Sequence, residues 1–216
     1  MMFTLVAAIS CGKDEPDPNQ PVKIPSVNAV DLGLSVKWAD ANVGAENESG
    51  FGLYFAWGET SVKENYSWES YKLCGGSSTS MTKYCTTAEY GKKDDLSVLQ
   101  PEDDIAHVAF GGKWRIPTEE EWKELKENCT WTKKLKDGEF IGYIVSSKVN
   151  ENSIFLPAAG GWENASAHRT GTTGFYWTAD LYEKSCYANV FFFNNGGLAN
   201  TYGSRSFGLP VRAVTE

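Results

Sequence analysis

Few side chains in this sequence have the types and spacing that catalysis requires. The chain has two histidines, and His107 follows Asp103 and Asp104 by four and three positions, so the three could meet on one helix face. The two carboxylates could also hold calcium, which prefers oxygen ligands, although an acidic first turn of a helix explains them more simply. No glycine-rich phosphate loop, GxSxG elbow or CxxC pair occurs. The sequence therefore predicts no catalytic residue and no metal site, and calcium stays open without a clear motif.

Binding chemistry is concentrated near the C-terminus, over residues 161–205. Tyrosine and tryptophan rings offer contact area, and amides offer adaptable hydrogen bonds, a combination that resembles an antibody paratope and also suits sugars. Alternation along the predicted strand Cys186–Phe193 places every second residue on the same face. We expect a binding face for a glycan or protein ligand, although half of its rings could belong to the core instead. The expected contact residues are Trp177, Asp180, Tyr182, Tyr187, Asn189, Phe191, Asn194, Asn195, Tyr202 and Arg205.

The cysteines indicate one candidate disulfide. Cys74 and Cys85 bracket a polar loop, and a bond between them would stabilise the fold by about 2–3 kcal/mol through the unfolded state. Two ordinary thiols are an equally open interpretation. Cys129 and Cys186 have the character of small buried hydrophobes.

The N-terminus indicates export and lipid attachment. Residues 1–10 are predicted to be a signal peptide, and the apolar run that ends before Cys11 resembles a bacterial lipobox, in which that cysteine carries the lipid. Residues 11–27 are acidic and proline-containing, as expected of a flexible tether. The sequence therefore predicts a protein at the surface of an outer membrane that contacts the membrane through its lipid anchor only.

Composition limits the class of partner. The 216 residues include 20 Lys and Arg against 28 Asp and Glu, a net charge of −8. A nucleic-acid-binding protein needs a basic footprint, so we exclude nucleic acid. Aromatic residues make up 13% of the chain, and its length is ample for one domain with a large core, over residues 28–216.

The elements that position these residues follow from local patterns. Thr118 and Glu121 form a capping box that begins a helix over 118–128, and Pro101 to Asp104 begins a shorter helix. Period-two alternation predicts a strand over 30–39 in which Gly33 is a candidate break, and residues 59–100 are expected to form long loops. Asn194 to Gly197 is a candidate for a hairpin turn. Strands are also predicted at Phe140–Val149, Ser153–Ala158, Gly174–Ala179, Cys186–Phe193 and Phe207–Val214. Strands on either side of one or two helices indicate an α+β fold with small antiparallel sheets and long loops.

Several blocks together resemble one family. They are Val30 to Ala39, Ala56 to Glu59, Pro101 to Asp104, Gly111 to Thr118, Phe155 to Gly160, Tyr176 to Thr178 and Pro210 to Val214. In this order they resemble the "major paralogous domain" family of Bacteroidetes and Fibrobacteres surface proteins. That family is similar to the formylglycine-generating enzyme and to the variable proteins of diversity-generating retroelements. The resemblance implies a C-type-lectin-like fold over residues 28–216, with a ligand face in the C-terminal segment.

The resemblance leaves three function classes. The formylglycine-generating enzyme uses a close pair of cysteines that bind copper, whereas this chain has the single Cys186 in that region. The shared block, Arg115 to Glu119, is a helix start and reports fold rather than catalysis. We therefore expect a non-catalytic surface lipoprotein that binds an extracellular glycan or protein. The alternatives are an adhesive, pilus-tip-like structural subunit or, with less support, a formylglycine-generating-type enzyme.

Overall fold

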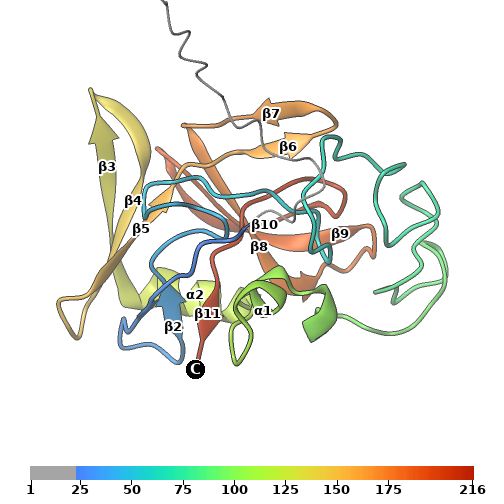
Figure 1. Ribbon diagram of the computed structural model, residues 1–216, viewed down its shortest axis with the longest axis horizontal. Coiled ribbons are helices and arrows are strands. Elements are labelled where there is room, and N and C mark those ends of the chain that lie inside the picture. The colour runs from blue at the N-terminus through green and yellow to red at the C-terminus, as the bar shows by residue number, and fades with distance from the viewer. Residues whose placement is uncertain (1–22) are drawn as a thin grey trace, which may run out of the picture.

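The computed structural model describes residues 23–216, and the predicted signal peptide and lipidation site at Cys11 lie outside this range. Figure 1 shows a mostly β molecule whose few helices lie along one side. The first half contains β1 (Ala29–Val30), β2 (Lys37–Ala39), a 3-10 turn (Pro101–Asp103), α1 (Ile105–Phe110) and α2 (Glu119–Asn128). The second half contains β3 (Cys129–Lys136), β4 (Glu139–Ser147), β5 (Ser153–Pro157), β6 (Gly161–Glu163), β7 (Ser166–His168), β8 (Thr173–Leu181), β9 (Tyr187–Asn194), β10 (Gly197–Ser204) and β11 (Val214–Thr215).

The strands form four small antiparallel sheets. Their orders are β1-β2-β11, β10-β9-β8, β3-β4-β5 and β6-β7. The first sheet joins the two ends of the described chain, since Val214 lies opposite Trp38. Small antiparallel sheets with two short helices confirm the α+β class. Among residues 23–216, no helix is long and apolar enough to cross a membrane.

One of the two predicted helix starts is confirmed and the other is shifted. Thr118 accepts a hydrogen bond from the backbone N–H of Glu121, and the Glu121 carboxylate accepts one from the Thr118 N–H at 2.8 Å, which completes the capping box of α2. Asp104 caps α1 by accepting from the N–H groups of Ala106 and His107. The start of α2 is therefore as predicted. The shorter helix begins later than predicted, because Asp104 is extended (ψ 108°) and separates the 3-10 turn Pro101–Asp103 from α1.

Two strand predictions need correction. The predicted strand over 30–39 is two short strands, β1 and β2, separated by a turn in which Gly33 has φ +72°. Of the predicted strand Phe207–Val214, only the last residue belongs to a strand, β11. The preceding residues are extended but bond to separate partners: Gly208 to Trp162, and Leu209 to Phe55. An extended segment shared among several partners has the alternation of a strand without a continuous ladder.

Two hydrophobic clusters enclose the sheet β10-β9-β8. Trp177, Ala188 and Val190 belong to one cluster, together with Trp57. Phe191 and Phe193 belong to the second, where Phe191 stacks on Trp122 of α2 at 4.5 Å between ring centroids. Because β9 contributes to a core on each face, alternation along it does not separate a wet face from a dry one.

The segment 59–100 contains no helix or strand, as expected, and lies beside β9 in teal and green in Figure 1. It is held by bonds to distant segments. The Thr86 N–H donates to Ser185 Oγ at 3.0 Å, and the Leu99 N–H donates to the Ala179 carbonyl at 3.0 Å. The loop is thus an ordered part of the domain beside the C-terminal sheet.

Candidate functional site

A groove lies between the β6–β7 hairpin and the sheet β10-β9-β8. Its first lobe has a volume of about 290 Å³. The second lobe, about 370 Å³, shares Glu163, Tyr202, Gly203 and Phe207 with the first and continues to Trp68 in the 59–100 loop. We call the two lobes together the aromatic groove, because its larger lining side chains are Trp68, Trp162, Phe175, Tyr187, Tyr202 and Phe207.

The hairpin wall of the groove is anchored at both ends of β6. Trp162 and Gly208 exchange backbone hydrogen bonds of 2.8 and 2.9 Å. Asn164, at the hairpin tip, exchanges bonds of 2.8 and 3.0 Å with Tyr66 of the long loop. Gly208 permits this close approach, because a Cβ there would lie 2.6 Å from the Tyr66 ring. The backbone of this wall is therefore fixed by bonds to two distant segments of the fold.

Charged side chains line the first lobe. The Nε2 atom of His168 lies 3.9 Å from a carboxylate oxygen of Glu163, and both side chains are about half exposed. The Arg169 guanidinium lies over the Phe175 ring, 6.0 Å from its centroid. The groove therefore presents an acceptor and a cation within reach of its aromatic lining.

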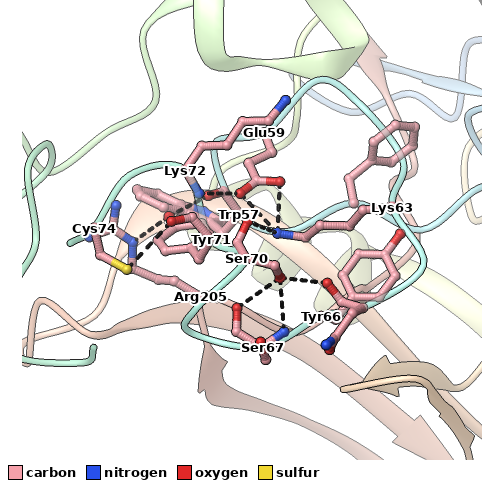
Figure 2. A network of polar contacts seen from close by, with 12 residues as sticks. Trp57, Glu59, Lys63, Tyr66, Ser67, Ser70, Tyr71, Lys72, Cys74 and Arg205 are labelled. Atoms are coloured by element: carbon pink, nitrogen blue, oxygen red, sulfur yellow. Dashed lines mark hydrogen bonds and ion pairs between the residues drawn. The ribbon is translucent and has the colours of Figure 1, made fainter. Parts of the chain in front are cut away.

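A buried network holds the wall that carries Trp68 (Figure 2). The Glu59 carboxylate accepts from the Lys72 N–H at 2.7 Å and pairs with the Lys63 ammonium at 2.9 Å. Arg205 Nε donates to the Tyr71 hydroxyl at 2.9 Å. Burial raises the pKa of Tyr71, so its hydroxyl stays protonated and donates onward to the Trp57 carbonyl at 2.6 Å. These bonds tie the 59–72 segment to the end of β10.

Three tyrosines from the expected set form a cluster beside the groove. The rings of Tyr182 and Tyr202 stack with centroids 4.2 Å apart, and Tyr187 lies 5.1 Å from Tyr202. Tyr202 is 50% exposed, while Tyr182 and Tyr187 are intermediate. Since Tyr187 and Tyr202 also line the groove, this part of the predicted face lies where the cavity is.

Two of the expected polar residues, Asn189 and Asp180, hydrogen-bond to Glu119 at the start of α2 and not to the groove. Asn189 Nδ2 donates to Glu119 at 2.7 Å, and Asn200 donates to the other carboxylate oxygen of Glu119 at 3.0 Å. Asp180 accepts from the Glu119 N–H at 2.6 Å. Burial raises the pKa of Asp180, although that hydrogen bond opposes the shift. These side chains attach β8, β9 and β10 to the start of α2.

The prediction of a ligand contact is wrong for three of the expected residues, because their side chains are buried. Trp177, Phe191 and Arg205 are all 0% exposed, so a surface ligand cannot touch them. Trp177 Nε1 donates to the Phe55 carbonyl at 2.7 Å, and Phe191 lies in the α2 core. The Arg205 guanidinium is enclosed by backbone carbonyls of Lys83, Tyr84 and Ser185. β8 and β9 contribute side chains to a core on each face of the sheet, which sequence alternation could not show.

The two expected residues of the hairpin turn lie apart from the groove. Asn194 Oδ1 accepts from the Gly196 N–H at 2.7 Å and so shapes the β9–β10 turn. Asn195 is exposed in the same turn. Tyr187 begins β9, whereas Asn194 ends it and Asn195 follows. The two ends of a strand of this length are about 20 Å apart. The structure does not bring them together with the tyrosine cluster.

The candidate disulfide and calcium ligands are engaged otherwise. Cys74 and Cys85 are free thiols, so the structure does not form the predicted bond. Cys74 Sγ donates to the Trp68 carbonyl at 3.3 Å, and Cys85 Sγ donates to that of Thr87 at 3.1 Å. Asp103 accepts from Lys83 and Tyr84, while Asp104 caps α1. Within residues 23–216, no group of three or more acidic, histidine or cysteine side chains could hold a metal.

Sequence reasoning missed most of the groove's first lobe. Trp162, Glu163 and His168 stand on a hairpin whose strands are only three residues each, too short for an alternation signal. Asn164 has φ +53° in the sharp turn between these two strands. Asparagine tolerates this conformation, so an asparagine in a polar segment is the one local signal that could have indicated the hairpin. Trp68 is distant in sequence, so only the tertiary fold brings it to the site.

The comparisons with known proteins identify no function. Residues 132–214 match a family described as a domain of unknown function (DUF8237). This segment covers less than half of the chain but includes every residue that lines the first lobe of the groove. Neither the curated proteins nor the solved structures contain a match to the chain.

Proposed function

We propose that this chain is a non-catalytic surface protein that binds a glycan through the aromatic groove. The observation that carries the proposal is the continuity of the two lobes, which together form an elongated, ring-lined depression. Sugars present apolar ring faces and hydroxyl edges at once. Aromatic side chains bind the faces, and charged or amide side chains exchange hydrogen bonds with the edges.

The shape and chemistry of the lining favour a saccharide over a compact apolar ligand. Trp162 and Phe207 supply ring faces in the first lobe, and Glu163 contributes a carboxylate to both lobes. The groove remains open to solvent along rings such as Tyr202, as an oligosaccharide longer than one unit requires.

The proposal includes a C-type-lectin-like fold and a place on the cell surface. Small antiparallel sheets, two short helices and long ordered loops are consistent with that fold, which the family resemblance implies. A lipid on Cys11 would anchor the domain to an outer membrane through the tether, and no other membrane contact is proposed. We propose no catalytic role. The reactive form of a cysteine is the thiolate, and burial disfavours it by raising the pKa of Cys186, the only cysteine of the C-terminal region.

A glycan array with the purified full chain tests this function. Selective binding that Trp162→Ala abolishes would support it, since that ring lines the groove from the anchored hairpin. Phe51→Ala is the matched control, because Phe51 is an exposed ring outside the groove. Unchanged thermal melting of both variants would show that loss of binding is local. A blank array would contradict the proposal.

One observation favours a structural subunit as the second candidate. β3, an edge strand, carries Lys133, Lys134 and Lys136, which discourage strand pairing. β10, the edge of its own sheet, contains no charged residue and is exposed over residues 199–202. An uncharged edge of this length could pair with β10 of a second copy. Light scattering tests this: Thr201→Lys would convert a dimer to a monomer, and a monomeric unmodified protein would contradict it.

A further inference from the structure

The first lobe of the aromatic groove contains a cation, Arg169, that no carboxylate of residues 23–216 pairs. The ion pairs in this part of the chain involve lysines, Arg115 and His168 instead. The Arg169 side chain makes no hydrogen bond in the same part of the chain, and its guanidinium lies over Phe175 in the groove lining. A fork of N–H donors is therefore presented at the cavity with its donors unused.

The backbone at Arg169 is held in an uncommon conformation. Its φ is +55°, a region that costs a side-chain-bearing residue roughly 1 kcal/mol or more. The Arg169 carbonyl accepts from the N–H groups of Thr172 and Thr173, both at 3.1 Å, and from the Thr172 hydroxyl at 2.9 Å. This tight turn directs the side chain from the end of β7 toward Phe175. Arg169 is exposed to solvent, and the contact of its guanidinium with the Phe175 ring places the cation at the groove lining.

We infer that the groove recognises a saccharide bearing a carboxylate, a uronic-acid unit, with Arg169 binding the carboxylate. The inference rests on the proposed glycan-binding function and names its ligand class. Guanidinium and carboxylate match in a planar, two-bond geometry that a neutral sugar cannot supply. The ring of Trp162 then lies against the sugar, Phe175 supports the guanidinium, and Glu163 accepts from the sugar hydroxyls.

Charge limits the ligand to few acidic units. Glu163 lines the same lobe and opposes an anion of higher charge, such as a phosphate dianion. The chain as a whole carries a net charge of −8, which repels a polyanion. One carboxylate matches the single charge of Arg169. The expected ligand is therefore an oligosaccharide in which an acidic unit stands among neutral ones.

The test pairs each acidic oligosaccharide with its neutral counterpart. The full chain is titrated calorimetrically with oligosaccharides containing galacturonate, glucuronate or mannuronate, and with the same molecules after reduction of each carboxylate to an alcohol. We expect an acidic member to bind about tenfold more tightly than its reduced partner, as for a charge-assisted pair. Arg169→Gln should remove this preference, and Arg169→Lys should retain part of it.

The control and the opposing outcomes separate the two proposals. Lys184→Gln removes an equal charge from an exposed position outside the groove lining and should leave the preference intact. Equal binding of the acidic and reduced members overturns the uronic-acid inference and leaves glycan binding standing. A preference that survives in Arg169→Gln also overturns the inference. Absence of binding to every member here and on the glycan array overturns the proposed function itself.

Discussion

Arg205 and Tyr71 meet in the interior of the molecule, where Arg205 Nε donates to the tyrosine hydroxyl at 2.9 Å and the guanidinium lies 5.3 Å from the ring centroid. The two residues come from the end of β10 and from the 59–100 loop. Their contact joins the wall that carries Trp68 to the strand that carries Tyr202. The shape of the second lobe therefore depends on a buried cation that does not itself line the groove.

Replacement of Arg205 should destabilise the fold. Arg205→Leu leaves the carbonyls of Lys83, Tyr84 and Ser185 without their donor, and each unsatisfied buried acceptor costs about 1–3 kcal/mol before relaxation. We expect the free energy of unfolding to fall by about 3 kcal/mol in urea denaturation. Arg205→Lys should also lose stability, because one ammonium cannot span these acceptors. A loss below about 1 kcal/mol in both variants would contradict this role.

The Glu121 carboxylate makes stability depend on acid pH. Burial opposes its charge, but the bonds from Arg115 and the Thr118 N–H outweigh burial and lower its pKa below 4.5. A lowered folded-state pKa gives stability that is complete above the unfolded-state value and is lost as the pH falls through the folded-state value. At pH 7, Glu121→Gln should therefore cost about 1 kcal/mol.

Urea denaturation at pH 7 and pH 3 measures this dependence. The difference in unfolding free energy between the native protein and Glu121→Gln should shrink at the lower pH, because the unfolded state then binds a proton at Glu121 more readily than the folded state does. Glu120→Gln is the control, since Glu120 is exposed and its ion pair with Lys123 is 3.6 Å long on the surface. A difference that stays constant with pH would show that the charge of Glu121 does not stabilise the helix start.

The local elements could be predicted from sequence where the signal lies within a few residues. Thr118 and Glu121 define the start of α2, and Asn194 to Gly197 defines the β9–β10 turn, without help from distant contacts. β10 itself was missed, because its sequence of small and polar residues has little strand preference and is held by pairing with β9.

The candidate site could be predicted only in part, for a physical reason. Polar aromatic residues are typical of binding faces, and this pattern selects Tyr187 and Tyr202, which line the groove. The same pattern selects Trp177, which is buried, since a ring on a sheet enclosed by two cores has the same local sequence as an exposed one. Arg169 and Trp68 come from separate turns and loops, so their place in the groove follows from tertiary contacts alone.

The free thiols should differ in reactivity. Cys74 is partly exposed, whereas Cys85 is 0% exposed in a cluster with Tyr71 and Met81. Alkylation of the native protein followed by mass spectrometry should label Cys74 first, and Cys85 only after unfolding. The masses should correspond to reduced thiols before alkylation. A peptide pair linked through Cys74 and Cys85 would contradict the structure at this loop and restore the disulfide.

The tyrosine cluster should contribute to binding unequally. Tyr202 lines both lobes of the groove and is half exposed, whereas Tyr182 stacks on it from outside the cavity lining. For a glycan found on the array, Tyr202→Ala should weaken binding about tenfold or more, as expected when a ring that contacts the ligand is lost. Tyr182→Ala should weaken it only a few-fold, because it removes support for the Tyr202 ring but no contact. Calorimetric titration of both variants distinguishes the two effects. If Tyr182→Ala is the more damaging change, the ligand lies on the tyrosine cluster beside Asn189 and Glu119, outside the aromatic groove.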